Sequence, residues 1–179
     1  MVSKKHYIIT SITLGLIAAS SAVLIGVTNL VTRDQIAQNE RNKILSGISE
    51  IYGENSLIKE EKAISDVNLK GEYKYLDILY TIEDNNEQRL GYAFKTSGSN
   101  MYGKIALIVG FDEVSHGFMS LTIVVNEQTY ASTLVDKYIN PLNDGSRVLN
   151  DTSCGATYGA KLVEAMVDEC KNAAQELWS

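Results

Sequence analysis

The sequence has few of the residues that usually build metal or phosphate sites. It contains only two histidines, His6 and His116; the first precedes a long apolar segment, and the second lies in a polar, turn-forming stretch. No group of His, Cys, Asp and Glu has the spacing of metal ligands, and no P-loop pattern is present. The sequence therefore predicts no metal centre and no P-loop nucleotide site.

Proline is almost absent, because Pro141 is the only one in 179 residues. No proline-rich linker, internal repeat or low-complexity tract divides the chain. Hydrophobic residues make up 45% of the sequence, so the part that remains beside a membrane segment is large enough to bury one core. We therefore expect one globular domain with one main site.

Cysteine is also scarce, and its placement disfavours an internal disulfide. Cys154 lies just before a predicted C-terminal helix, and Cys170 lies several turns along it. A rise of about 1.5 Å per residue separates the two by roughly 20 Å, which is far beyond the reach of a disulfide. We expect two free thiols, or an intermolecular bond at Cys154.

Ionised side chains are missing from a long stretch near the N-terminus. No residue from 7 to 32 is charged at neutral pH, and a helix of that length can cross the hydrocarbon layer. A cleaved signal peptide is the alternative, because residues 18–22 are small. The apolar run nevertheless continues well beyond them, to Val31. We predict a single-pass protein of the cell membrane, with its transmembrane helix within residues 1–33.

Positive charge is concentrated before this predicted span. Lys4 and Lys5 precede it, whereas Arg33 and Asp34 cancel each other just after it. The positive-inside bias therefore places the N-terminus in the cytoplasm and the remaining chain outside. Without Lys4, Lys5 and Arg33, 13 of the 16 basic residues remain against 22 acidic ones, a formal charge of −9. Such a surface repels nucleic acid, which we exclude as a partner.

Behind the span, the pattern predicts a helical neck and then a small α+β domain. Apolar residues recur at helical spacing as far as Tyr52, Gly53 ends the helix, and polar sequence follows. Short polar connections between the expected strands favour a mostly antiparallel sheet with flanking helices. The strands are expected at residues 73–82, 89–97, 104–111 and 118–126. The chain thus divides into a cytoplasmic tip and transmembrane helix (1–33), a helical neck and connection (34–66) and an extracytoplasmic domain (67–179).

The C-terminal segment completes the predicted domain with a helix. Apolar residues recur there at helical spacing, and charged residues occupy the other positions around the helix. The apolar stripe consists of Val163, Met166, Val167, Cys170, Ala173 or Ala174, and Leu177. We expect this helix to pack its stripe on the sheet.

The segment that leads into this helix is the most informative for chemistry. Residues 151–157 read Asp-Thr-Ser-Cys-Gly-Ala-Thr. The unpaired N–H groups and partial positive charge of a helix N-terminus stabilise a phosphate. Gly155 and Ala156 would let the backbone come close to that phosphate, and Thr157 offers a hydroxyl for a phosphate ester. The alternative is that one of the polar residues 151–153 simply caps the helix.

This segment resembles the flavinylation motif of the FMN-binding domain family, which reads Asp, two variable residues, Ser or Thr, Gly, Ala, Thr. The positions that match are Asp151, Gly155, Ala156 and Thr157, whereas Cys154 replaces the usual Ser or Thr. In that family FMN is joined through its phosphate to the final Thr, so the resemblance implies covalent FMN on Thr157. It also implies maturation by a separate FAD-dependent flavin transferase that uses magnesium.

Other segments extend the resemblance over nearly the whole chain. They read Thr-Arg-Asp-Gln-Ile at 32–36, Gly-Tyr-Ala-Phe at 91–94, Ser-Gly at 97–98, Tyr-Gly-Lys-Ile at 102–105 and Val-Gly at 109–110. In order and spacing they resemble the G subunit of the Rnf ferredoxin:NAD oxidoreductase complex. The related C subunit of the sodium-pumping NADH:quinone reductase is usually longer. The resemblance implies an electron-carrying subunit of a redox-driven translocase, with other membrane subunits as partners, and no catalyst on its own.

The other residues expected to hold the flavin lie in the motif or in a preceding loop. They are Ser153, Cys154, Tyr158, Glu127, Thr129 and Tyr130. The loop 127–132 keeps the Glu and Thr of the family but lacks its following Gly-Leu-Gly. Those glycines would let the backbone lie close to a flavin ring, so Tyr130 either fills that space or stacks on the ring. Tyr92, Phe94 and Tyr102 are further candidates for covering the ring, but we favour ordinary core or strand packing for them, because aromatic residues are common in strands.

Two other functions stay open. A thiol beside a helix N-terminus can have a lowered pKa, which would make Cys154 a nucleophile, although neither histidine is placed to act as its base. The altered loop 127–132 also permits a flavin-free extracytoplasmic scaffold or interaction module.

Overall fold

The computed structural model describes residues 4–179, with side chains described for residues 11–29 and 31–179. The chain forms two compact units, Met1–Asn42 and Lys43–Ser179. The predicted orientation of the span depends on Lys4 and Lys5. Their side chains, like the side chain of His6, lie outside the described ones.

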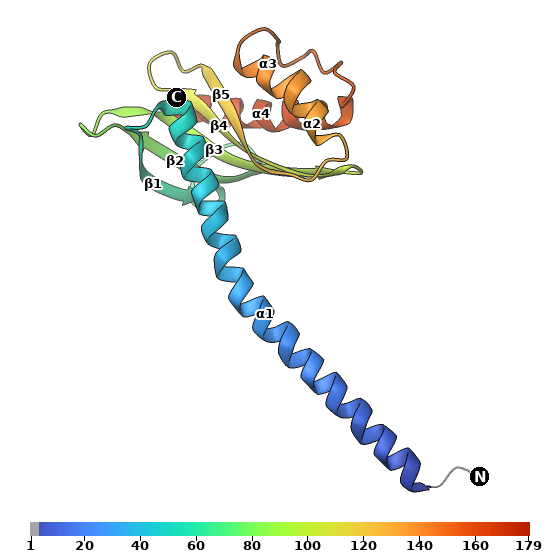
Figure 1. Cartoon of the computed structure of the whole chain (residues 1–179). Helices are drawn as coiled ribbons and strands as arrows, with labels where there is room; N and C mark the ends of the chain where they lie inside the picture. The colour runs from blue at the N-terminus through green and yellow to red at the C-terminus, as the bar shows by residue number, and fades with distance from the viewer. Residues whose placement is uncertain (1–3) are drawn as a thin grey trace. The chain divides into compact units, whose positions relative to one another are not determined.

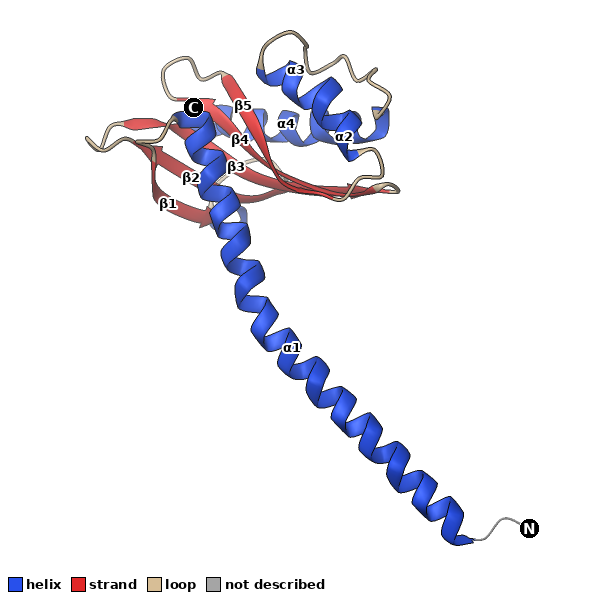
Figure 2. Ribbon diagram, in the orientation of Figure 1, coloured by secondary structure: helices blue, strands red, loops and turns tan. Residues whose placement is uncertain are grey.

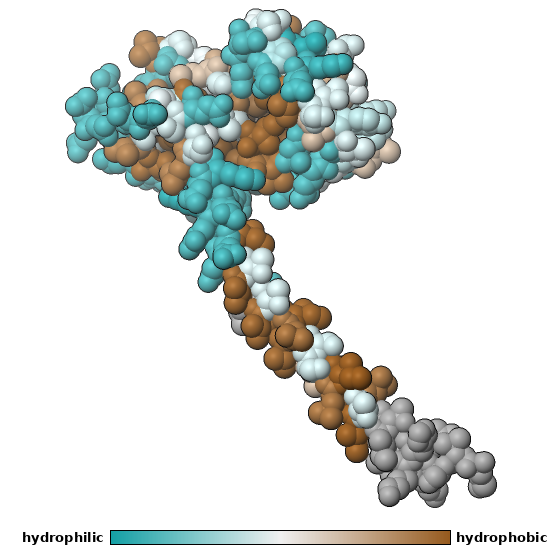
Figure 3. Space-filling view, in the orientation of Figure 1, coloured by the Kyte–Doolittle hydropathy of each residue, from teal (hydrophilic) through white to brown (hydrophobic). Residues whose placement is uncertain are grey.

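The first unit is built from the greater part of one long helix, α1 (Lys4–Tyr52). Its large apolar side chains between residues 12 and 31 are 55–71% exposed, and they form the brown stretch of Figure 3. Ser20 and Ser21 donate their hydroxyls to the carbonyl of Ile17, at 3.0 and 2.9 Å, so these polar groups are satisfied within the helix. The helix is long and apolar enough to cross a membrane, and it fits a single-pass membrane protein.

The second unit is an α+β domain around one antiparallel sheet, as predicted (Figure 2). The strands follow the order β1-β2-β3-β4-β5, so every pair of neighbours is also consecutive in sequence. Their bounds are β1 Leu57–Ala63, β2 Leu76–Glu83, β3 Arg89–Asn100, β4 Gly103–Asp112 and β5 Phe118–Asn126. A short η1 turn, Ile64–Asp66, follows β1.

Both faces of this sheet are covered, and the central strand β4 shows how. Its residues from Ile105 to Gly110 are all buried, but successive side chains point to opposite faces. Leu107 and Val109 join the core under α4 (Thr157–Leu177), whereas Ala106 and Ile108 join the core under the last turns of α1. In Figure 1, α4 lies on the same side of the sheet as α2 and α3.

The last turns of α1 belong to the second unit and bury part of the predicted apolar stripe. Ile44, Ile48 and Ile51 are buried against the sheet. The Tyr52 hydroxyl accepts a hydrogen bond from the backbone N–H of Phe111 at 3.0 Å, and it lies 2.7 Å from the carbonyl of Tyr92, to which it can donate. Burial raises the pKa of Tyr52, so it stays a neutral anchor. The helix ends before Gly53, as predicted.

Three parts of the second unit differ from the prediction. Residues 57–63, expected to be a polar connection, form the edge strand β1, whose charged residues face solvent as is usual on sheet edges. β2 begins at Leu76 instead of residue 73, because Tyr73 and Tyr75 bond to acidic side chains of α4. The region after β5 holds unpredicted helical turns: α2 Ala131–Leu134, the π-helical η2 Val135–Ile139 and α3 Asn140–Asn143.

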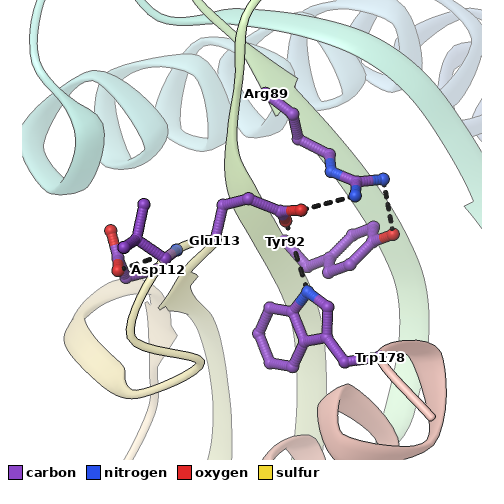
Figure 4. Close-up of polar contacts among 6 residues, drawn as sticks. Arg89, Tyr92, Asp112, Glu113 and Trp178 are labelled. Carbon is purple, nitrogen blue, oxygen red and sulfur yellow. Dashed lines mark hydrogen bonds and ion pairs between the residues drawn. The ribbon is translucent and has the colours of Figure 1, made fainter.

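The C-terminal end of the chain is fastened to the β4–β5 connection. Glu113 pairs with the guanidinium of Arg89, and its second oxygen accepts a hydrogen bond from the indole of Trp178 at 3.3 Å (Figure 4). The ring of His116 stacks on that indole, with centroids 4.3 Å apart and planes 9° apart. Tyr92 lies on the indole as well, with its centroid 5.5 Å away.

Candidate functional site

The site begins at the N-terminus of α4, whose first residue is Thr157. Its N-cap is Ala156, and no side chain donates or accepts a capping bond there. The reading in which one of residues 151–153 caps the helix is therefore wrong, because those residues lie too early in the chain. The first turn also has no acidic residue, so neither a cap nor a carboxylate compensates the partial positive charge at this helix end.

Gly155 turns the loop into the helix. Its φ of +82° is a left-handed conformation that side chains strongly disfavour. A Cβ at this position would meet nothing closer than Thr133 Cγ2 at 3.6 Å, so backbone geometry, and not space, requires the glycine. Gly155 thus sets the direction in which α4 begins, in addition to its expected role of leaving the backbone accessible.

A pocket of about 250 Å³ opens at this helix end. Five of its lining residues come from the end of the motif and the first turn of α4, and four come from earlier parts of the chain. The lining consists of Gly155, Ala156, Thr157, Tyr158 and Gly159 from the motif and α4, together with Tyr102, Gln128, Tyr130 and Leu134. The volume is at the small end for a ligand pocket, so a larger planar group would fill it and extend past its rim.

Three tyrosines form the aromatic part of the pocket. Tyr102 lies between the other two, with ring centroids 5.4 Å from Tyr158 and 6.1 Å from Tyr130. Tyr130 and Tyr158 are 54% and 60% exposed, which is unusual for large aromatic side chains in a small domain. A flat aromatic ligand could stack against such side chains and cover apolar surface that water now contacts.

A buried amide holds the loop of Tyr130 against the tip of the β3–β4 hairpin. Gln128 Nε2 donates to Asn100 Oδ1 at 3.1 Å and also to the carbonyl of Gly103. Asn100 Nδ2 in turn donates to the carbonyl of Tyr158 at 3.1 Å. One hydrogen-bonded network therefore connects the hairpin, the loop and the first turn of α4, and it fixes the pocket walls relative to one another.

Gly103 lets these walls approach one another. Its φ is +133°, and a Cβ there would lie only 2.1 Å from the carbonyl oxygen of Glu127. Any larger residue would push the loop that carries Gln128 and Tyr130 away from the hairpin.

The predicted site residues fall into two groups. Thr157, Gly155, Ala156, Tyr158 and Tyr130 come together in the pocket lining. The other five do not line it: Asp151, Ser153, Cys154, Glu127 and Thr129. Asp151 pairs with Arg147 instead, with Nη1 to Oδ2 at 3.0 Å, and Thr129 donates its backbone N–H to the carbonyl of Tyr102 at 3.0 Å.

Both cysteines are free, as predicted for one of the two alternatives. Cys154 is only 6% exposed, and Cys170 is fully buried in the core under α4. Burial raises the pKa of the Cys170 thiol well above its usual value. The burial of Cys154 argues against both an intermolecular disulfide and an accessible nucleophile at this position.

Sequence reasoning missed Gln128 and Arg147, and it ranked Tyr102 below Tyr130 and Tyr158. Gln128 lies between the two family-like residues of its loop, Glu127 and Thr129, so its position could have indicated a role in the site. It was overlooked because a glutamine side chain is usually exposed. Tyr102 was a candidate for covering the ring for which strand packing was favoured, but it follows β3 and lies in the hairpin turn. Arg147 precedes Asp151 by four residues, a spacing that suits an ion pair only if the intervening chain turns.

The arrangement can bind an anion at the helix end and a planar group among the tyrosines. The described residues include no group of three or more His, Cys, Asp and Glu side chains that could hold a metal ion. The phosphate and the ring system of FMN match these two features. The residues that would hold them are the first turn of α4 with Thr157 for the phosphate, and Tyr102, Tyr130 and Tyr158 for the ring.

Fold and site together define a class of protein. Its described residues include one helix that is long and apolar enough to cross a membrane, and an α+β domain with a tyrosine-lined pocket at the start of its last helix. Within that class, the model of the RnfG N-terminal region matches residues 1–51. This match supports the resemblance to the G subunit of Rnf-type complexes, and it covers α1 as far as Ile51 but none of the pocket residues. No curated protein matches the chain.

Proposed function

We propose that this chain is the flavin-carrying subunit of an Rnf-type electron-transfer complex, with FMN joined through its phosphate to Thr157. The observation that carries the proposal is the position of Thr157, which is the first residue of an uncapped helix and lines a pocket with three tyrosines. The N–H groups of the first turn suit the phosphate, and the tyrosines suit the ring. The match of residues 1–51 supports the assignment to an Rnf-type complex.

The attachment is a group transfer from FAD by a separate transferase. The hydroxyl oxygen of Thr157 forms a bond to the phosphorus on the FMN side, and the pyrophosphate bond of FAD breaks. AMP leaves with the second phosphate, and the hydroxyl proton passes to a base of the transferase or to solvent. When bound, the flavin would supply the uptake and release of electrons, while the residues of this chain orient it and cover it.

The proposed topology places the N-terminus in the cytoplasm and the second unit outside. The transferase, its FAD and the multi-span partner subunits would then meet this domain on the extracytoplasmic side. The acidic surface of the exported part is compatible with such partners and unsuited to nucleic acid.

The decisive experiment is the intact mass and ultraviolet fluorescence of the denatured full chain. The chain is produced with and without an FAD-dependent flavin transferase, and exported to the compartment where that enzyme acts. We expect a fluorescent band that carries the added mass of FMN on the peptide containing Thr157. Thr157→Val should lose all covalent flavin, whereas Thr152→Val, which removes a hydroxyl from the same loop, should keep it.

Other outcomes separate the alternatives. Covalent flavin that persists in Thr157→Val would place the attachment elsewhere. Unmodified wild-type protein, beside a control substrate that the same transferase modifies, would favour the flavin-free scaffold, in which Tyr130 fills the space of a ring instead of stacking on one.

A further inference from the structure

Asp151 is the first residue of the flavinylation-like segment, yet it lies outside the pocket. Arg147 Nη1 donates to its carbonyl oxygen at 2.6 Å and lies 3.0 Å from its carboxylate Oδ2. The other carboxylate oxygen accepts the N–H of Ser153 at 3.4 Å. One nitrogen of Arg147 therefore binds both the backbone and the side chain of Asp151, which fixes the direction in which the chain leaves that residue.

Arg147 is itself held by the helical turns before the loop. Its backbone N–H donates to the carbonyl of Pro141 at 2.9 Å, and its guanidinium lies 6.0 Å from the ring centroid of Tyr138. Tyr138 is buried, and its hydroxyl donates to the carbonyl of Leu149 at 2.7 Å. The side chain of Arg147 is 19% exposed against 54% for Asp151, so the arginine is the anchored partner of the pair.

The segment between this anchor and α4 has no regular secondary structure. Such a segment samples many conformations unless its ends are fixed, and ordering its backbone costs free energy for every residue. Fixing Asp151 leaves five residues, 152–156, to reach the start of α4. This restriction would help to keep Thr157 at the pocket, while Ser153 and Gly155, which are exposed, stay accessible to a modifying enzyme.

We propose that Arg147 is a positioning residue for the modification of Thr157: by holding Asp151, it presents the segment 151–157 in the conformation that the flavin transferase modifies. The inference rests on the proposed function, because it concerns the same attachment. Arg147 itself does not touch the flavin or the reacting atoms.

The test measures the rate of covalent FMN attachment to the full chain by intact mass, per folded molecule. Arg147→Met keeps an unbranched apolar side chain in place of the arginine stem but removes its donors, and it should lower the rate about fivefold. Arg147→Lys should restore the rate, because both contacts to Asp151 come from a single nitrogen that an ammonium can replace. Combining Arg147→Met with Asp151→Ala should lower the rate no further than Asp151→Ala alone.

Arg89→Met is the matched control, since it removes a different arginine–carboxylate pair, Arg89 with Glu113, at the end of the sheet near Trp178. It should leave the attachment rate unchanged. A wild-type rate in Arg147→Met, or a failure of Arg147→Lys to restore the rate although it melts like wild type, would overturn the role of Arg147. Wild-type protein that takes up no flavin would overturn the proposed function as well, so the two failures are distinguishable.

Discussion

The two ends of α4 are built in opposite ways. At the C-terminal end, Trp178 is held between the ring of His116 and the carboxylate of Glu113, and Glu176 accepts bonds from the N–H of Gly71 at 3.1 Å and the hydroxyl of Tyr73 at 2.8 Å. At the N-terminal end, no side chain caps the helix, and Tyr158 in the first turn is 60% exposed.

Because of this difference, the C-terminal end of the helix contributes to stability, while its N-terminal end is available for binding. We call the C-terminal end of α4 the closed end and its N-terminal end the open end. Contacts at the closed end hold α4 on the sheet and connect the last residues to the strands. The open end keeps unpaired N–H groups and aromatic surface that would be lost if side chains satisfied them. A group can therefore be attached at the open end without loosening the helix that carries it.

The largest predicted effect comes from a substitution that disrupts the pocket at the open end of α4. Gly103→Ala places a Cβ about where the carbonyl oxygen of Glu127 now lies, in a left-handed conformation. We expect a loss of about 3 kcal/mol in the free energy of unfolding, measured by urea titration, because backbone and not a flexible side chain must move. The loop of Tyr130 should separate from the hairpin, so covalent attachment on Thr157 should fall too.

Gly145→Ala is the control for backbone strain alone. Gly145 has a φ of +76°, but a Cβ there would meet nothing within 4 Å. The loss should be about 1 kcal/mol, the usual cost of such a conformation for alanine. Equal losses in the two variants would show that the approach of Gly103 to Glu127 does not hold the pocket together.

The second prediction concerns a substitution that removes the side-chain contacts of the closed end. Trp178→Ala removes the indole that His116, Tyr92 and Glu113 contact, and we expect a loss of about 2 kcal/mol in the free energy of unfolding. Attachment of FMN to Thr157 should stay at the wild-type rate in the folded protein. Gln175→Ala, an exposed position one turn earlier, should change neither quantity.

The same comparison explains what could be predicted from the sequence. The buried stripe of α4, which includes Val163, Met166 and Cys170, was predicted because apolar residues at helical spacing have few other solutions. Strand β1 was missed because its charged residues, needed on an exposed sheet edge, hide the alternating pattern of a strand.

The candidate site was predictable only where local sequence decides. Residues 155–158 lie on either side of the start of α4, and because they are adjacent in the chain they come together in any fold. The contributions of Tyr102 and Gln128 depend on how the hairpin and the loop pack, and the pairing of Asp151 with Arg147 depends on the turn between them. Such contacts follow from tertiary structure, which spacing alone does not specify.

The smallest predicted effect is a pH-dependent contribution of Glu176 to the stability of the closed end. The carboxylate of Glu176 accepts the backbone N–H of Lys70, the hydroxyl of Tyr73 and the N–H of Gly71, and these bonds hold its pKa below the usual value near 4.5. Burial, with a smaller effect from Glu176, raises the pKa of Tyr73 to about 12, so Tyr73 remains a donor throughout. A carboxyl whose pKa is lowered by folding stabilises the protein above its unfolded pKa, and this contribution disappears as the pH falls through the lowered value.

Glu176→Gln should therefore melt below wild type at pH 7, and the difference should shrink as the pH falls from about 5 through the lowered pKa of Glu176. Thermal midpoints at neutral and acidic pH measure this difference, with Asp168→Asn on the exposed side of the same helix as the control. A difference that is the same at both pH values would mean that the amide loses packing and not charge. The closed end would then be held by shape and by the Trp178 contacts, and the carboxylate would add nothing to the asymmetry between the two ends of α4.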